Sequence, residues 1–144
     1  MTECSAEWAQ YESFCYKNFQ GQLRWEDARQ ACLDIRSDLV SIHSTAENKF
    51  IDTTYLAGGH YYWIGLSRET QEGVFQWSDE TSYNVEFFSP DPSEGDLSDC
   101  VFIRYGKWFD KDCDANQWRI CKKRGEINLI KLVIIIPDRV SGDP

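Results

Sequence analysis

Two stretches in the first half of the chain have the hydrophobic spacing of amphipathic helices. In the first, apolar residues recur at every third or fourth position, at Trp25, Ala28, Cys32 and Ile35. The second opens with STAE, where Ser44 suits the N-cap and Glu47 the third helical position of a capping box. We therefore predict one helix from Trp25 and another from Ser44 to about Tyr55, which Gly58 and Gly59 end.

Most of the remaining chain consists of short aromatic and β-branched runs separated by turn residues, which is typical of strands. These runs occupy residues 13–19, 39–43, 61–66, 74–77 and 100–105. A long polar segment with two prolines separates Trp77 from Cys100, and loops of that length in compact domains are usually functional. The pattern predicts an α+β fold with strands around a long loop.

Composition indicates a folded, acidic domain. The chain has 144 residues, of which 42% are hydrophobic and 15% aromatic, so it can bury a core of its own. A net charge of -9 argues against nucleic acid or an anionic membrane as partner, because both bind basic surfaces. Between Asp79 and Asp114 carboxylates outnumber basic residues ten to three, which fits a solvated acidic face or a cation site.

The six cysteines favour disulfides over zinc. No CxxC pair is present, and neither His43 nor His60 lies at zinc-finger spacing from a cysteine. We therefore expect an oxidising, extracellular compartment, although six cysteines alone allow 15 pairings. The opening residues MTECSAEW lack the pattern of a signal peptide, so we expect a fragment of a longer secreted or membrane-anchored protein.

Several motifs together resemble the C-type lectin-like domain of the long form. They are WIGL at 63–66, FQW at 75–77, DCVFI at 99–103, GKWFD at 106–110 and the cysteine spacing. The resemblance spans residues 4–124, and we assign 1–124 to the domain. It implies a C-type lectin-like fold, with two helices flanking small antiparallel sheets and a long loop region. The implied disulfides are Cys4–Cys15, Cys32–Cys121 and Cys100–Cys113. Within WIGL, Trp63 and Leu66 read as core, and Gly65 as a point of close backbone approach.

Sugar-binding members of that family hold calcium at the long loop, and this chain keeps part of their ligand set. Asp91, Ser93 and Asp110 match the principal site, whereas Ser98 replaces an acid and Phe109 replaces an asparagine. At the auxiliary site Asp99 and Glu72 match, but Arg68 stands where the family often has aspartate. An improvised set from Asp91, Glu94, Asp96, Asp99 and Asp110 would bind calcium weakly, at ~10⁻⁴–10⁻³ M.

The resemblance and the incomplete ligand set predict an extracellular, non-catalytic recognition module that binds a protein or an atypical ligand and requires no cofactor. Its expected ligand-binding residues are Asp91, Ser93, Phe88, Phe109 and Asp110. Phe88 and Phe109 fit equally well as surface anchors or as core, whereas Trp118 fits the core. The alternative is a calcium-dependent carbohydrate-binding lectin that uses Asp91, Ser93, Asp99 and Asp110.

An enzyme is not expected, because the chain has no GxSxG, HExxH or glycine-rich phosphate loop. His43 reads as a helix-entry residue and His60 as an exposed turn. Residues 125–144 lie outside the resemblance and form a tail. Its apolar run at 127–136 is too short to span a bilayer, so direct membrane insertion is not expected. The run suits a strand leading toward a neighbouring domain, or an extension added to the chain.

Overall fold

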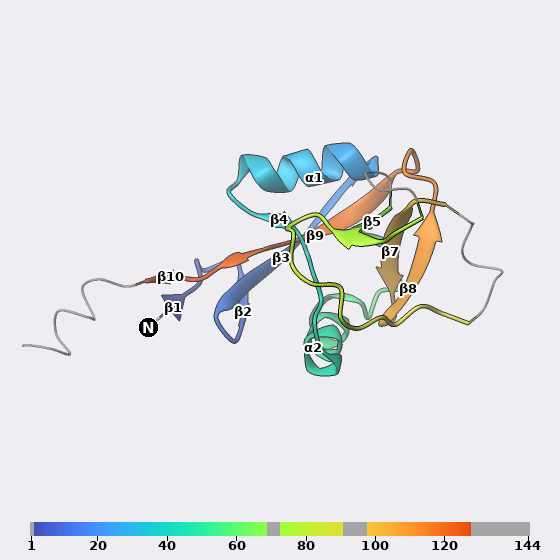
Figure 1. The fold of residues 1–144 in the computed structure, drawn as a ribbon. Coiled ribbons are helices and arrows are strands. Elements are labelled where there is room, and N and C mark those ends of the chain that lie inside the picture. Colours follow the sequence, from blue (N-terminus) through green and yellow to red (C-terminus); the bar gives the residue numbers. More distant parts are fainter. Residues whose placement is uncertain (1, 69–72, 91–97, 128–144) are drawn as a thin grey trace, which may run out of the picture.

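The computed structural model describes residues 2–68, 73–90 and 98–127 (Figure 1). Its helices are α1 (Trp25–Asp34) and α2 (Thr45–Tyr55). The strands are β1 (Thr2–Glu3), β2 (Ala9–Tyr11), β3 (Phe14–Leu23), β4 (Asp38–Leu39), β5 (Tyr62–Ser67), β6 (Gln76–Trp77), β7 (Cys100–Arg104), β8 (Lys107–Lys111), β9 (Gln117–Arg124) and β10 (Glu126–Ile127).

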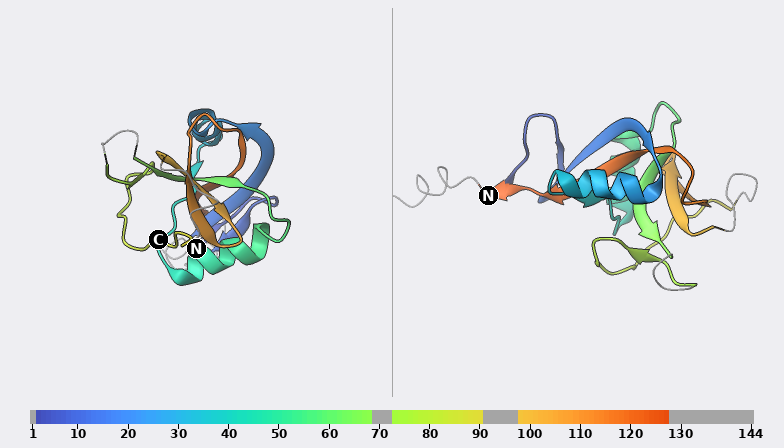
Figure 2. Two further views of the ribbon diagram at one scale, coloured as in Figure 1. Left: turned by 90° about the vertical axis from the view of Figure 1, so that its right-hand side faces the viewer. Right: turned by 90° about the horizontal axis from the view of Figure 1, so that it is seen from above.

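The central sheet contains strands from both the N-terminal and the C-terminal part of the domain. Its order is β2-β3-β9-β5-β7-β8, with β4 also paired to β9 and β6 to β5, and β1 pairs with β10 in a second sheet. Among the pairs of named strands in the described ranges, only β5 and β9 run parallel. The helices lie on opposite sides of the central sheet (Figure 2). The predicted α+β fold with two flanking helices is therefore confirmed.

The long antiparallel β3–β9 ladder lies in the middle of the domain. Phe14 pairs with Arg124 and Lys17 with Cys121, so the first and last long strands are neighbours. The β1–β10 pair lies at one end of the domain, and the β7–β8 hairpin lies at the other (Figure 1).

All three implied disulfides are confirmed. Cys32–Cys121 joins α1 to β9 over 89 residues, and closing so long a loop stabilises the fold by ~4.6 kcal/mol in the chain-entropy model. Cys100–Cys113 joins the start of β7 to the segment after β8. Cys4–Cys15 holds the N-terminal segment against β3. The cross-links therefore reach both ends of the domain.

Both predicted helices form. Trp25, Ala28 and Cys32 are buried, but Ile35 is 40% exposed, because α1 ends at Asp34 and Ile35 is its C-cap, outside the helical repeat. The expectation that Ile35 continues the buried face was wrong. The start and end of α2 match the prediction.

The cap of α2 differs in one detail from the expected capping box. Ser44 Oγ accepts a hydrogen bond from the backbone N–H of Glu47 at 3.0 Å, as predicted. The Glu47 carboxylate accepts from the N–H of His43 at 2.8 Å, one residue before the N-cap. His43 thus lies at the helix entry, as expected.

The predicted strand over 39–43 is shorter than expected. Only β4, which ends at Leu39, has regular pairing. Val40 donates its N–H to Ile120 in β9, and its carbonyl accepts from Gly65 in β5. Val40 therefore bridges two strands instead of extending a ladder along one of them.

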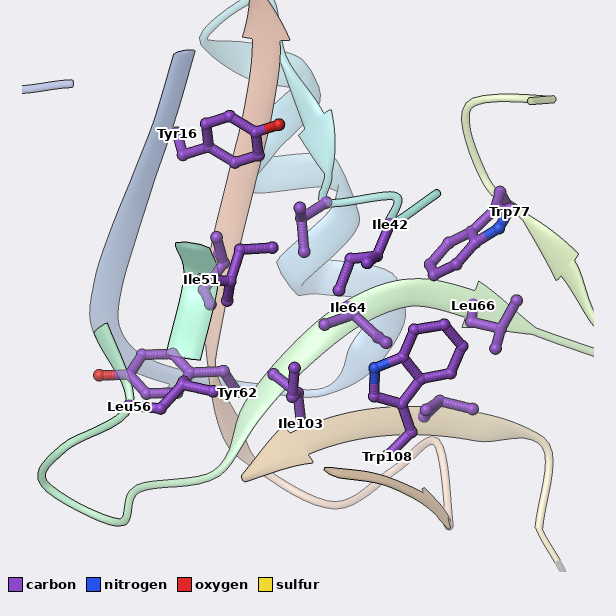
Figure 3. Packing of buried hydrophobic residues seen from close by; sticks show 13 residues of the cluster. Tyr16, Ile42, Ile51, Leu56, Tyr62, Ile64, Leu66, Trp77, Ile103 and Trp108 are labelled. Carbon is purple, nitrogen blue, oxygen red and sulfur yellow. The ribbon is translucent and has the colours of Figure 1, made fainter. Parts of the chain in front are cut away.

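The core is rich in tryptophan, and the WIGL motif lies within it. Trp63 and Leu66 are fully buried, as predicted. A Cβ on Gly65 would approach the carbonyl oxygen of Leu39 to 2.9 Å, so the expected close approach is confirmed. Figure 3 shows the indoles of Trp77 and Trp108 beside Leu66, and the two rings meet edge to face at 5.4 Å. The tryptophans of the motifs, together with Leu66, are thus packing residues.

One buried ion pair crosses this core. Lys122 Nζ on β9 contacts Glu47 Oε2 on α2 at 2.6 Å and also donates to the carbonyl of Ser41 at 2.9 Å. The Tyr16 hydroxyl donates to the same Glu47 oxygen, and burial together with Glu47 raises the pKa of Tyr16. Both charges are therefore paired and hydrogen-bonded, as burial requires.

The described part of the tail pairs with the N-terminal strand. Glu126 pairs with Glu3 and Ile127 with Thr2, while the rest of the tail lies outside the described residues. Within the described ranges no helix is long and apolar enough to cross a membrane.

Candidate functional site

The β7–β8 hairpin brings two of the predicted acidic ligands to one end of the sheet. Asp99 directly precedes β7, and Asp110 lies on β8, paired with Val101. The disulfide Cys100–Cys113 closes this end of the hairpin. The side chain of Asp99 is 58% exposed and that of Asp110 is 22% exposed. The hairpin thus positions two carboxylates at the base of the long segment.

Arg68 lies between these carboxylates. Its Nε is 3.3 Å from Asp99 Oδ1, and its terminal nitrogen is 3.5 Å from Asp110 Oδ2. The same terminal nitrogen donates to the carbonyl of Ser98 at 2.8 Å. The guanidinium also lies 4.7 Å from the centre of the Phe75 ring. We call Arg68, Asp99 and Asp110 the arginine cluster.

The described residues of this cluster do not fit a calcium ion. Calcium takes six to eight oxygen ligands, whereas here the cationic guanidinium occupies the space between the two carboxylates. Asp110 Oδ2 also accepts a hydrogen bond from the Ser98 N–H at 3.1 Å. In the described ranges no group of three His, Cys, Asp or Glu side chains could hold a metal ion. The other predicted ligands lie outside those ranges: Glu72, Asp91, Ser93, Glu94 and Asp96.

The two phenylalanines expected near the ligand have different surroundings. Phe109 is 8% exposed and stacks on Phe102 at 5.0 Å, so it belongs to the core. Phe88 is half-buried, with its ring 5.4 Å from Phe75 and 5.8 Å from Trp108. Strand alternation places Phe109 on the opposite face of β8 from its neighbours. Of the two rings, only Phe88 borders open space.

That open space is a hollow of about 510 Å³ beside the arginine cluster. We call it the loop hollow; its apolar walls and carboxylates come from Val74, Phe75, Tyr83, Phe88, Glu86 and Asp110. Burial and the neighbouring Glu86 raise the pKa of Tyr83 to about 12, so its hydroxyl remains protonated at neutral pH. The hollow therefore offers aromatic surface rimmed by negative charge.

Sequence reasoning found Phe88 and Asp110 but missed the other residues of this wall. The FQW motif predicts a strand at Phe75, which lies one residue before β6. Tyr83 and Glu86 belong to the long polar segment, where the sequence identifies Glu86 only as one of the ten acids between Asp79 and Asp114. Their meeting depends on tertiary contacts between β6, β8 and the segment between them, which periodicity does not report.

The comparisons with known proteins agree with this architecture. The sequence family described as Lectin C-type domain matches residues 21–123. This chain belongs to the C-type lectin domain family. The C-type mannose receptor 2 of Homo sapiens is 34% identical over 131 residues, covering 88% of this chain and 9% of the receptor. The C-type lectin domain family 4 member M of Gorilla gorilla gorilla is 31% identical over 124 residues, covering 83% of this chain and 33% of that protein.

Two solved structures share this fold over most of the chain. The cow carbohydrate-recognition domain of CD23, solved with a GlcNAc2Man3 oligosaccharide, has a TM-score of 0.79 and 29% identity over 88% of this chain and 100% of its own. A calcium-independent type II antifreeze protein has a TM-score of 0.78 and 25% identity over 88% of this chain and 98% of its own. The chain spans a third or less of the two curated relatives above. Whole-protein roles of those relatives therefore do not transfer directly.

Proposed function

We propose that this C-type lectin domain is an extracellular, non-catalytic recognition module that binds its ligand without calcium. The observation that carries the proposal is the guanidinium of Arg68 between Asp99 and Asp110. The three disulfides support an oxidising compartment outside the cell.

The arginine supplies the positive charge that calcium supplies in sugar-binding members of the family. It is covalently part of the chain, so no ion has to be captured or dehydrated. Its forked donors contact both carboxylates and the Ser98 carbonyl, and such charge-assisted hydrogen bonds are directional. A calcium ion would have to displace a tethered cation. The base of the long segment is thus held without metal.

The loop hollow supplies the recognition surface in this proposal. Phe75, Phe88 and Tyr83 offer aromatic area, while Glu86 and Asp110 place negative charge at the rim. Aromatic contacts surrounded by polar groups are typical of protein interfaces. The combination suits a protein ligand that presents an apolar side chain next to lysine or arginine.

A calcium-dependent carbohydrate site is the alternative, and one comparison favours it. The CD23 domain, with 29% identity, was solved in the presence of an oligosaccharide. The calcium-independent antifreeze protein, at 25% identity, favours the metal-free reading of the same scaffold. The two functions differ in their dependence on calcium, which is directly measurable.

Thermal unfolding with and without calcium tests the proposal. A ligand of the folded state raises stability by RT ln(1 + [L]/Kd), so about 10 mM calcium would stabilise even a site of ~10⁻³ M by ~1.4 kcal/mol. We expect equal midpoints in about 10 mM calcium and in chelator. Magnesium at the same concentration controls for ionic strength.

Retention of the protein on immobilised mannose distinguishes the proposed function from the calcium-dependent carbohydrate site. Calcium-dependent retention that chelator reverses, and that Asp110→Asn abolishes, would contradict the proposal and establish the carbohydrate function. Glu7→Asn is the matched control, because Glu7 is an exposed acid that pairs with Lys17 far from the loop hollow.

A further inference from the structure

A group of basic and aromatic side chains lies on one face of the β3–β9 ladder. Residues that pair directly across an antiparallel ladder share a face, and side chains alternate along each strand. Phe19 pairs with Arg119, and Lys17 pairs with Cys121, whose disulfide partner lies on α1 on this side of the sheet (Figure 2). Lys123 is two residues beyond Cys121 and therefore lies on the same face. We call this group the basic face; it consists of Trp8, Lys17, Phe19, Arg119 and Lys123.

Two aromatic rings position the cations of the basic face. The rings of Trp8 and Phe19 meet edge to face, with their centres 6.3 Å apart. The guanidinium of Arg119 lies 4.5 Å from the centre of the Phe19 ring, and Lys17 Nζ lies 5.3 Å from the same centre. Lys123 Nζ lies 4.2 Å from the centre of the Trp8 ring. Cation–π contacts thus gather three positive charges around two rings.

Arg119 is the least compensated of these cations. Its Nε is buried without a hydrogen-bond partner, and no acidic side chain in the described ranges pairs with its guanidinium. Burial lowers the pKa of Arg119 from its ordinary value. The two terminal nitrogens are not enclosed in this way, so a ligand can reach them. A cation that has already lost part of its water gains more from an incoming anion than a fully hydrated one does.

The charge of the basic face is opposite to that of the whole chain. The chain carries 24 acids and a net charge of -9. Among the residues that the structure describes, the one ion pair of the three cations joins Lys17 Nζ to Glu7 Oε1 at 3.4 Å. The side chain of Glu7 is 81% exposed, and so solvated a partner compensates little of the positive charge. The basic face therefore attracts anions although the chain is acidic.

The spacing of the cations suits an extended anion. Arg119 and Lys123 are four residues apart on β9, which corresponds to about 13 Å along a strand. One small anion cannot contact both side chains, whereas a chain of sulfated sugars carries negative groups along its whole length. Sulfate oxygens accept charge-assisted hydrogen bonds from guanidinium and ammonium groups. The half-buried rings of Trp8 and Phe19 offer apolar surface to the C–H groups of a sugar ring.

We propose that the basic face binds a sulfated glycan. Arg119 and Lys123 contact sulfate groups, Lys17 adds a third contact, and the ring of Trp8 contacts a sugar. The disulfides indicate a compartment outside the cell, which favours a sulfated glycan over a nucleic acid as the polyanion. Binding requires neither calcium nor the loop hollow, so this site is independent of the function proposed above.

Titration of the isotope-labelled, disulfide-bonded chain with a heparin hexasaccharide, followed by NMR, tests the proposal. We expect shifts of the indole N–H signal of Trp8 and of the Nε–H signal of Arg119, which persist in chelator and decrease as salt is added. The matched probes are an unsulfated hexasaccharide of the same backbone and a glutamate oligomer, which is a polyanion without sugar. Equal binding of either probe, or no shift with heparin, would overturn the proposal.

Removing the cations locates the contact. Arg119→Gln is expected to weaken heparin binding about tenfold or more, because a hydrogen bond between charged groups is lost. Lys123→Gln is expected to cause a several-fold loss. Lys49→Gln is the matched control, because Lys49 is an exposed lysine on α2, outside the basic face. Unchanged binding in both Arg119→Gln and Lys123→Gln would refute the assignment.

A variant that strengthens binding separates a lost contact from a folding defect. Glu7→Gln removes the acid that pairs with Lys17 and leaves all three cations, so we expect several-fold tighter heparin binding. A misfolded chain would not show such a gain. Glu80→Gln makes the same charge change at an exposed acid outside the basic face and should leave binding unchanged. Unchanged or weaker binding in Glu7→Gln would contradict the placement of the glycan on the basic face.

Discussion

Two clusters of opposite charges in this domain have similar chemistry and different surroundings. In the core, Lys122 and Glu47 are 6% and 7% exposed and lie 2.6 Å apart. At the base of the long segment, the side chains of Arg68, Asp99 and Asp110 are 25%, 58% and 22% exposed, with separations of 3.3 and 3.5 Å. Both clusters connect strands with segments distant in sequence.

The difference in burial decides whether a charged group mainly stabilises the fold or can also contact a ligand. A charge in the core must keep its partner, because water cannot replace it. A charge at the rim is partly solvated, so losing a partner costs little and the group is available to ligands. The Lys122–Glu47 pair therefore belongs to the scaffold, whereas the arginine cluster lies at the candidate site.

Removing one partner of the Lys122–Glu47 pair is expected to cause the largest loss in the free energy of unfolding. Glu47→Gln leaves Lys122 as an uncompensated buried charge, so we expect a loss of about 3–5 kcal/mol in the free energy of unfolding. Urea denaturation measures it. Glu7→Gln removes the exposed partner of Lys17 and is expected to change stability by less than about 1 kcal/mol.

A double variant sharpens this result. Glu47→Gln combined with Lys122→Met removes the unpaired charge and is expected to recover part of the loss. If the double variant is less stable than Glu47→Gln, the pair is not the source of the effect.

The next largest loss of stability is expected for Phe109→Asn, which restores the asparagine of the family's calcium motif. Phe109→Asn removes a ring that stacks on Phe102, so we expect a loss of about 3 kcal/mol and no gain of calcium binding while Arg68 remains. Thermal unfolding with and without calcium measures both quantities. Phe88→Asn, at the loop hollow, is the matched control, and a smaller loss is expected because Phe88 is half-buried. A calcium-dependent rise of the midpoint in Phe109→Asn would contradict this prediction.

The smallest expected effect on stability is at the arginine cluster itself. Arg68→Gln is expected to lower stability by at most about 1 kcal/mol, because the group is partly solvated. The variant leaves Asp99 and Asp110 unopposed, so calcium should now raise its unfolding midpoint. Arg24→Gln makes the same charge change at the exposed pair with Asp27 and should stay insensitive to calcium. A calcium-insensitive Arg68→Gln variant would show that the arginine does not substitute for the ion.

Local chemistry made much of the fold predictable. The capping box at Ser44 specifies the start of α2, because the side chain bonds a backbone N–H three residues away. The apolar spacing of α1 was equally informative up to Asp34, where the helix ends. The strand at 39–43 was too long, because Val40 bonds two different strands, an arrangement that alternation does not encode.

The candidate site was less predictable. Motif matching found Asp99, Asp110 and the unusual Arg68, all of which the structure brings together. It left Phe109 undecided between core and surface, and only its stacking on Phe102 decides for the core. Tyr83 and Glu86 carried no motif.

The sequence by itself determined the helices, the disulfide-rich α+β class and the family, because these rest on spacing, capping and a combination of motifs along the chain. Only the tertiary structure decided what the charged residues do. Arg68 lies 42 residues before Asp110 in the sequence, and Glu47 lies 75 before Lys122. Whether such charges meet, and how much water reaches them, depends on the packing of strands and helices. That packing buries the Lys122–Glu47 pair in the scaffold and leaves the arginine cluster partly solvated at the candidate site.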